Sequence, residues 1–162
     1  MKQEELERNY PNSTDLINIQ HKDFYGPLDF SRYIFLTNLD CSDNAISALD
    51  LNDCPNLTDL NCSNNILEQL IVSHNLQLKN LNCSNNSLTK LNVNSNRLLI
   101  KLSFANNRIK EINITNNEQL TRFDCFNNPL ENASFLLSLN VEQLTFLRLN
   151  EEILTNFLDA NA

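Results

Sequence analysis

The chain has 162 residues, a length typical of one domain, and it contains 30 Asn and 29 Leu but a single Gly. One glycine excludes the Walker loop and the dinucleotide-binding fingerprint, because both need several glycines to bring backbone N–H groups close to a phosphate. A formal net charge of -8 argues against nucleic acid as a partner, since phosphate-backbone binding requires clustered Lys and Arg.

The first residues are hydrophilic and contain a short predicted helix. Residues 3–8 form its body, and the helix is expected to end near Tyr10 and Pro11 because proline disfavours helical continuation. We expect residues 1–16 to cap the N-terminal end of the domain. The sequence shows neither the apolar core of a signal peptide nor an apolar run of about 18 residues. We therefore expect a cytoplasmic protein without membrane contact.

A 21-residue repeat organises the rest of the chain. Its first column contains Leu39, Leu60, Leu81, Leu102 and Phe123. Five residues later, an invariant column contains Asn44, Asn65, Asn86, Asn107 and Asn128. The pattern predicts a degenerate first repeat over 17–38, four regular repeats over 39–122, and a lengthened last repeat with a final strand over 123–149. All of these belong to one domain spanning 1–162.

Each repeat is expected to contribute one short strand to a parallel sheet. Leu60 and Cys62 point into the coil, whereas Asn61 and Ser63 point outward, as strand geometry requires. Each repeat then buries its apolar side only against its neighbours. The invariant asparagines lie where the chain leaves the strand, and their amides can satisfy donors and acceptors of the turning backbone. We predict that this column is a structural ladder, and that Asn also occupies the tight turns usually given to glycine.

The C-terminal part of the chain departs from the regular spacing. The register lengthens by three residues after Phe123, which predicts a final strand around Leu147 and a helical turn at 134–137. Asn150 is expected to cap the N-terminus of a helix within residues 150–162. This helix carries an apolar stripe of Ile153, Leu154, Phe157 and Leu158. The stripe predicts that the helix packs on the last repeat as a C-terminal cap.

The repeat unit resembles a known family. The pattern Leu-x-Cys-Ser-x-Asn-x-Leu/Ile followed by Leu-x-Leu/Val, as in residues 60–72 and 81–93, resembles the 21-residue (IRREKO-type) leucine-rich repeats. The opening, over residues 4–11, 17–19 and 28–30, resembles leucine-rich repeat proteins of root-symbiotic fungi. The resemblance implies an α/β leucine-rich repeat solenoid, with a single curved parallel sheet on its concave face, short strands and turns on the convex side, and short capping helices at both ends. It implies a binding module and supplies no catalytic residue.

The five cysteines argue against both a disulfide framework and a metal site, because their number is odd and no CxxC spacing occurs. Cys41, Cys62 and Cys83 are expected to be neighbouring buried thiols. A thiol nucleophile needs a nearby base, but His21 and His74 lie at different phases of the coil. We therefore predict no enzymatic activity, no metal and no cofactor.

The outward side of the sheet is the candidate binding surface. Residues 1–80 carry 12 acids and 5 bases, whereas residues 81–162 carry 8 acids and 7 bases. Phe126 interrupts a column of Ser and Ala next to Arg122 and Arg148, and clusters of aromatic and Arg side chains are typical interface anchors. The alternative to an exposed anchor is that the inserted residues of the lengthened last repeat bury Phe126. The candidate partner-binding residues are Asp40, Asp59, Asn61, Asn82, Lys101, Ser103, Arg122, Asp124, Phe126 and Arg148.

These features predict a monomeric, non-catalytic module that binds an unidentified protein or peptide on its concave face. The alternative is a carbohydrate-binding or ice-binding surface. Its regular hydroxyls and amides would come from Ser42, Ser63, Ser84, Asn64, Asn85 and Asn106. The curvature of a leucine-rich sheet and the charge gradient along the chain disfavour this alternative.

Overall fold

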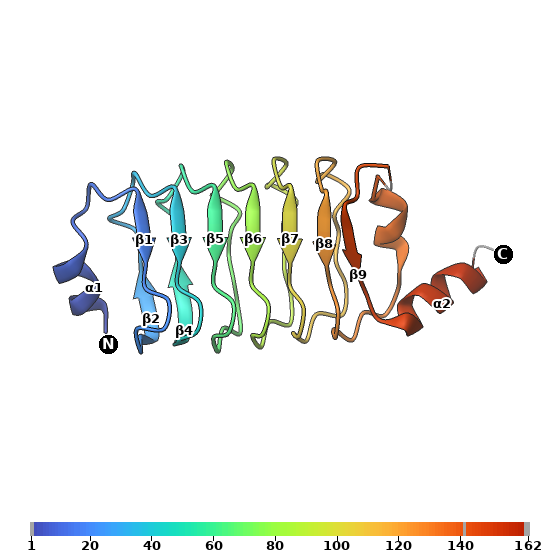
Figure 1. The fold of residues 1–162 in the computed structure, drawn as a ribbon, viewed down its shortest axis with the longest axis horizontal. Helices are drawn as coiled ribbons and strands as arrows, with labels where there is room; N and C mark the ends of the chain where they lie inside the picture. Colours follow the sequence, from blue (N-terminus) through green and yellow to red (C-terminus); the bar gives the residue numbers. More distant parts are fainter. Residues whose placement is uncertain (1, 141, 161–162) are drawn as a thin grey trace.

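The computed structural model describes residues 2–140 and 142–160, and its main element is a seven-stranded parallel sheet (Figure 1). Each strand has three residues, and the strand order in the sheet follows the order in the chain. The strands are β1 (Leu16–Asn18), β3 (Asn38–Asp40), β5 (Asp59–Asn61), β6 (Asn80–Asn82), β7 (Lys101–Ser103), β8 (Arg122–Asp124) and β9 (Phe146–Arg148). One strand per turn of the coil makes the fold a solenoid, as the repeats predict.

The register between neighbouring strands shows where the repeat length changes. Ile17 pairs with Leu39, 22 positions later, and Phe123 pairs with Leu147, 24 positions later, while the strands between are 21 positions apart. On the opposite side of the coil, β2 (Tyr25–Asp29) and β4 (Ala45–Asp50) form a short parallel pair. The later repeats pass through turns there, so this convex side carries little regular sheet.

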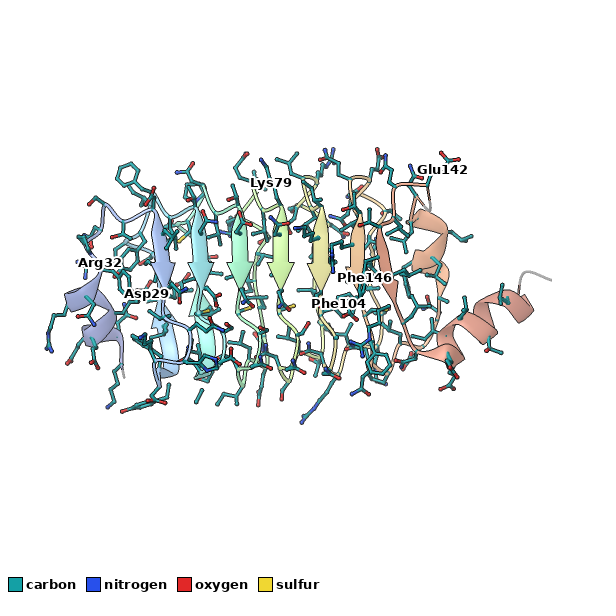
Figure 2. The ribbon with its side chains drawn as sticks, viewed as in Figure 1. Asp29, Arg32, Lys79, Phe104, Glu142 and Phe146 are labelled. Carbon is teal, nitrogen blue, oxygen red and sulfur yellow. The ribbon has the colours of Figure 1, made fainter. Side chains whose placement is uncertain are left out.

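The core is a stack of apolar side chains inside the coil (Figure 2). The leucine column is buried, and the thiols of the cysteine column are buried and free. Phe104 takes the cysteine position in one repeat, and its ring packs edge-on against Phe123 with 5.6 Å between centroids. Phe123 in turn lies 5.5 Å from Phe135, which belongs to the 3-10 helix η1 (Ser134–Ser138). The insertion in the last repeat therefore covers the large rings of this end.

The invariant asparagines form a ladder between successive turns. The Nδ2 group of Asn107 donates to the carbonyl oxygens of Cys83, Phe104 and Ala105 at 2.9–3.3 Å. Its Oδ1 accepts a hydrogen bond from the backbone N–H of Leu88 at 2.9 Å. The same four bonds recur, shifted by one repeat each time, at Asn44, Asn65, Asn86 and Asn128. The ladder satisfies backbone groups that the three-residue strands leave unpaired.

A second asparagine ladder runs along the convex side, at a recurring column to which the sequence reasoning assigned no role. The Nδ2 group of Asn96 donates to the carbonyl oxygens of Val72 and Asn75, both at 2.9 Å. Asn75 and Asn117 make the equivalent bonds in their own turns. In the first regular repeat the Cys54 thiol takes this place and donates to the carbonyl oxygen of Phe30 at 3.3 Å. The signal was present in the sequence, because these asparagines also recur every 21 residues.

Left-handed residues turn the chain immediately before each rung of the first ladder. Their φ angles lie between 54° and 57°, a region in which most side chains clash with the backbone. They are Asp43, Asn64, Asn85, Asn106 and Asn127. Asn and Asp thus occupy turns that glycine takes in other chains, because their short polar side chains tolerate this conformation.

The N-terminal end of the coil is covered by helix α1 (Gln3–Asn9). Leu6 of this helix is fully buried. The Gln3 side chain donates to the carbonyl oxygen of Asp29 at 2.8 Å and accepts from the Asp29 N–H at 2.9 Å. A side-chain amide therefore takes the place of a neighbouring strand at the edge of β2, which protects that edge from other chains.

The C-terminal helix α2 (Glu151–Ala160) extends away from the sheet (Figure 1), so its predicted packing was wrong in part. Ile153 is buried, but Leu154 and Leu158 are exposed. The side chain of Phe157 lies outside the described part of the structure. An apolar stripe indicates amphipathicity without specifying the surface on which a helix packs. Within residues 2–140 and 142–160, neither α1 nor α2 has the length and apolar character needed to span a bilayer.

Asn150 does not cap this helix with its side chain, contrary to the prediction. Its Oδ1 accepts a hydrogen bond from the N–H of Asn127 at 2.6 Å, and its Nδ2 donates to the carbonyl oxygen of Asn128 at 3.2 Å. Both polar atoms of the Asn150 side chain therefore bond to backbone groups of the preceding turn. The backbone N–H groups in the first turn of the exposed helix can bond to water instead of to a capping side chain. Asn150 therefore closes the last turn of the coil.

Candidate functional site

A groove of about 590 Å³ lies on the outward side of the seven-stranded sheet and reaches every strand. The middle residue of every strand from β1 to β8 in this sheet is buried in the core, so the first and third residues point outward; Leu147, the middle residue of the last strand β9, is 42% exposed. In β5, Leu60 is 2% exposed, whereas Asp59 and Asn61 are partly exposed. We call this outward surface, made of the first and third residues of the seven strands, the concave face.

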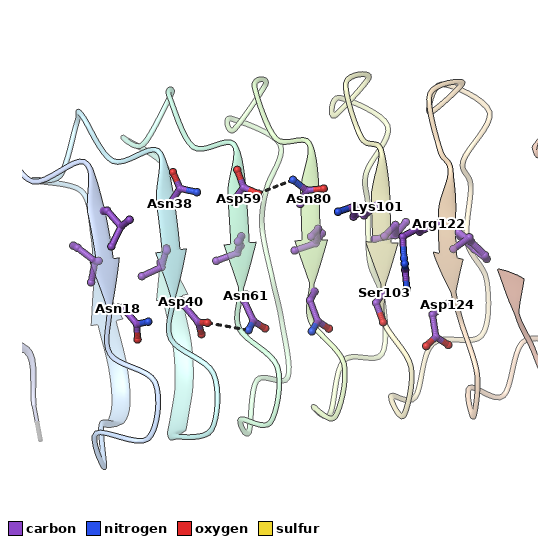
Figure 3. Close-up of a pocket in the computed structure, with 18 of the residues that line it drawn as sticks. Asn18, Asn38, Asp40, Asp59, Asn61, Asn80, Lys101, Ser103, Arg122 and Asp124 are labelled. Atoms are coloured by element: carbon purple, nitrogen blue, oxygen red, sulfur yellow. Dashed lines mark hydrogen bonds between the residues drawn. The ribbon is translucent and has the colours of Figure 1, made fainter. Parts of the chain in front are cut away.

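Two rows of mostly polar side chains line the groove (Figure 3). The upper row in the figure contains Asn38, Asp59, Asn80, Lys101 and Arg122. The lower row contains Asn18, Asp40, Asn61, Ser103 and Asp124. Asn82 belongs to the same lining. Adjacent strands are about 4.8 Å apart, so one extended ligand can contact several members of a row.

The acids at the N-terminal end of the groove already have hydrogen-bond partners. Asp59 accepts from the hydroxyl of Thr58 at 2.7 Å and from Nδ2 of Asn80 at 2.6 Å. Asp40 accepts from the hydroxyl of Ser42 at 2.6 Å and from Nδ2 of Asn61 at 3.2 Å. These carboxylates are therefore partly satisfied within the protein.

The bases at the C-terminal end are placed differently. Lys101 and Arg122 occupy paired positions on β7 and β8, and both are exposed. Among the described residues, neither has a carboxylate within 4.0 Å. The guanidinium carbon of Arg122 lies 4.8 Å from the ring centroid of Phe146, which is 36% exposed and lines the groove. This end combines two available cations with an accessible aromatic ring.

Phe146 is a groove residue that the sequence reasoning missed. It is the first residue of β9 and pairs with Arg122 across the sheet. The lengthened last repeat hides this relationship from a strict 21-residue alignment. The signal was the position of Phe146 directly before the leucine of the final strand, where the repeats from Asn38 to Arg122 carry polar residues and only the degenerate first repeat carries an apolar one, Leu16.

Phe126 and Arg148 lie outside the described lining of the groove. The guanidinium carbon of Arg148 lies 4.2 Å from the Phe126 ring centroid, and its Nη1 lies 3.8 Å from Oδ2 of Asp124. Phe126 is thus half-buried beneath Arg148. The predicted contact of Phe126 with Arg148 is confirmed. Arg122 instead lies over the ring of Phe146, which the longer last repeat places beside it.

The serine column lies on the outward side but is buried, so its hydroxyls are not available to a ligand. Ser42, Ser63 and Ser84 are only 1%, 6% and 7% exposed. The hydroxyls of Ser42 and Ser63 donate to the side chains of the outward residues Asp40 and Asn61, two positions earlier, at 2.6 and 2.8 Å. The hydroxyl of Ser84 lies 2.7 Å from that of Ser103, another outward residue. The hydroxyl ladder needed for the alternative carbohydrate-binding or ice-binding surface is therefore not exposed.

The cysteines are poor candidates for chemistry. Burial raises the pKa of the Cys83 and Cys125 thiols to about 12 and that of Cys54 to about 11. Burial also raises the pKa values of Cys41 and Cys62 well above the ordinary value. Reactivity requires the thiolate, which these environments disfavour. Within residues 2–140 and 142–160, no three His, Cys, Asp or Glu side chains are grouped in a way that could hold a metal ion.

Solved structures resemble this fold, although no protein-family model and no curated protein sequence matches the chain. The functional domain of InlJ from Listeria monocytogenes, described as including a cysteine ladder, has a TM-score of 0.71 and 26% identity, covering 84% of this chain and 32% of that chain. A leucine-rich repeat protein of Leptospira interrogans has a TM-score of 0.68 and 20% identity, covering 78% of this chain and 37% of that chain. An internalin of Listeria monocytogenes has a TM-score of 0.68 and 19% identity, covering 83% and 44%.

The chain spans less than half the length of each of these structures. Their fold and the observed one-strand turns identify a leucine-rich repeat solenoid, as predicted. The assignment to the 21-residue class and the fungal resemblance stay predictions.

Proposed function

We propose that this leucine-rich repeat solenoid is a non-catalytic module that binds a protein or peptide on its concave face. The observation that carries this proposal is the groove across seven strands, which ends in an accessible Phe146 ring and in two cations that have no carboxylate within 4.0 Å in the part of the chain that the structure describes. Aromatic and Arg side chains are the residue types that most often anchor protein interfaces.

The architecture supports the same proposal. Stacked repeats produce extended surfaces on which one partner can contact many turns at once. The similarity to leucine-rich repeat structures supports an interaction role at this coarse level. Among the described residues, neither the buried thiols nor any metal-holding cluster offers a catalytic centre.

The test compares partner capture by the wild type with capture by two matched variants. Asn82→Trp places a large uncharged ring in the concave face, and Asn92→Trp places the same side chain on the convex side. Each Asn accepts one hydrogen bond from the backbone N–H two positions later, at 3.2 Å and 3.0 Å respectively, so the structural cost is matched. We expect proteins captured from an extract of the source cells to be lost with Asn82→Trp and kept with Asn92→Trp. Equal capture by both variants would contradict the proposal.

A further inference from the structure

The two ends of the concave face differ in how their charges are satisfied. At the acidic end, Asp40 and Asp59 accept hydrogen bonds from hydroxyl and amide groups of the protein. At the basic end, Lys101 and Arg122 have no carboxylate within 4.0 Å among the described residues. The charges that lack an opposite partner are therefore those of Lys101 and Arg122, at the basic end.

The register of the sheet also places the two unpaired cations next to each other. Lys101 and Arg122 pair directly across β7 and β8, and like charges on opposing positions of adjacent strands destabilise a sheet. The nearest outward acid on β8, Asp124, already lies 3.8 Å from the guanidinium of Arg148. An anionic group from a ligand would relieve the repulsion between Lys101 and Arg122.

The surroundings favour a peptide over a small free anion. Phe146 provides an apolar surface beside Arg122, and its ring holds the guanidinium at 4.8 Å without neutralising it. Farther along the groove, the Nδ2 groups of Asn38 and Asn82 and the Oδ1 atom of Asn80 make no hydrogen bond among the described residues, so they can donate to and accept from a peptide backbone. A free anion would contact only the two cations. A peptide would contact the cations, the Phe146 ring and the amides.

We propose that the basic end of the concave face binds an acidic peptide segment. A carboxylate of the segment lies between Lys101 and Arg122, and an apolar side chain next to it packs on Phe146. The inference rests on the proposed function, because it names the partner of the same surface. The chain as a whole repels an acidic segment, with its net charge of -8, so the attraction must come from this local pair.

The test selects random 12-residue peptides displayed on phage against the immobilised chain. The test variant is Lys101→Met with Arg122→Met. The control is Lys90→Met with Arg108→Met, which changes the net charge equally at exposed positions outside the groove lining. We expect peptides enriched in Asp and Glu beside apolar residues. Their Kd should weaken about tenfold or more with the test variant, as expected for the loss of charge-assisted hydrogen bonds, and should stay unchanged with the control.

Three results would overturn the inference while leaving the proposed function standing, provided that Asn82→Trp still blocks the selected peptides. The peptides would lack acidic residues, would bind the test variant as tightly as the wild type, or would be displaced by inorganic phosphate at the same concentration as by free peptide. Peptide binding that is insensitive to Asn82→Trp, or no selection of any peptide, would contradict both. Circular dichroism of every variant checks that the fold is kept.

Discussion

The Oδ1 atom of Asn107 accepts a hydrogen bond from the backbone N–H of Leu88, which lies 19 positions earlier on the preceding turn. The same side chain donates through Nδ2 to the carbonyl oxygen of Phe104 on its own turn. One buried amide therefore ties two turns together. Since each repeat packs only against its neighbours, such ties stabilise the coil as a whole.

Replacing this rung is expected to cost more stability than a typical surface substitution. Asn107→Ala leaves the Leu88 N–H and three carbonyl oxygens without the amide, and each buried unpaired group costs about 1–3 kcal/mol. We expect the free energy of unfolding in urea to fall by more than about 2 kcal/mol. Asn116→Ala is the control, because Asn116 is exposed and makes one side-chain hydrogen bond, at 3.2 Å. An unchanged urea midpoint for Asn107→Ala would contradict the ladder's role.

The second ladder predicts a rank order of two substitutions at one site. Asn96→Ala removes both hydrogen bonds to the carbonyl oxygens of Val72 and Asn75, so we expect a loss of about 1–3 kcal/mol. Asn96→Cys should cost less, because Cys54 at the equivalent position donates to the carbonyl 24 positions earlier. Thermal unfolding of both variants measures the order. A Cys variant less stable than the Ala variant would argue against this ladder.

The left-handed turns predict that two replacements at Asn85 differ in their effect on stability. Asn85→Val places a β-branched side chain at a φ of 56°, and we expect a loss of roughly 1–2 kcal/mol from steric strain. Asn85→Gly removes the strain and only one exposed hydrogen bond from Asn106, so its stability should stay within about 1 kcal/mol of the wild type. Urea unfolding followed by circular dichroism separates the two. Equal stability of both variants would contradict the backbone argument.

The buried thiols predict a loss of stability in alkali. In the folded chain the pKa values of Cys83 and Cys125 are raised to about 12, whereas an unfolded thiol titrates near 8.5. Because folding favours the protonated form, the stabilisation is complete below the unfolded pKa. It is lost as the pH rises toward 12, by up to about 1.4 kcal/mol per pH unit for each thiol. We expect the free energy of unfolding to fall between pH 8 and pH 10.

A variant without these two thiols provides the control for alkali. Cys83→Val with Cys125→Val removes two titrating groups while keeping apolar side chains in the core. The fall between pH 8 and pH 10 should be clearly smaller in this variant than in the wild type. An equal fall in both proteins would mean that other groups carry the pH dependence.

Much of the fold could be predicted because equivalent side chains pack in the same way in each regular repeat, so the sequence pattern recurs at a fixed spacing. Leu60 and Cys62 alternate with outward residues within a strand, and the invariant Asn column marks the turn that follows. The burial of Ser42, Ser63 and Ser84 was not predicted, because their hydroxyls bond to the neighbouring outward side chains. Alternation along a strand predicts the side on which a residue lies, not whether its neighbours cover it.

The residues of the groove were harder to predict where the repeat length changes. Phe146 meets Arg122, and Arg148 covers Phe126, only because the last repeat is three residues longer than the regular ones. The side chain of Asn150 bonds to the preceding turn instead of its own helix for a similar reason: its partners lie 22 and 23 positions earlier in the chain. Contacts of this kind depend on three-dimensional register, which local sequence patterns do not specify.

Hydroxyl-radical footprinting of the captured complex measures which face the partner covers. Phe146 reports on the groove, and Ile66 and Ile71 are exposed residues outside the groove lining. If the concave face binds the partner, oxidation of Phe146 slows in the complex while oxidation of Ile66 and Ile71 is unchanged. Protection of Ile66 and Ile71 with unaltered oxidation of Phe146 would place the partner elsewhere and contradict the proposed function.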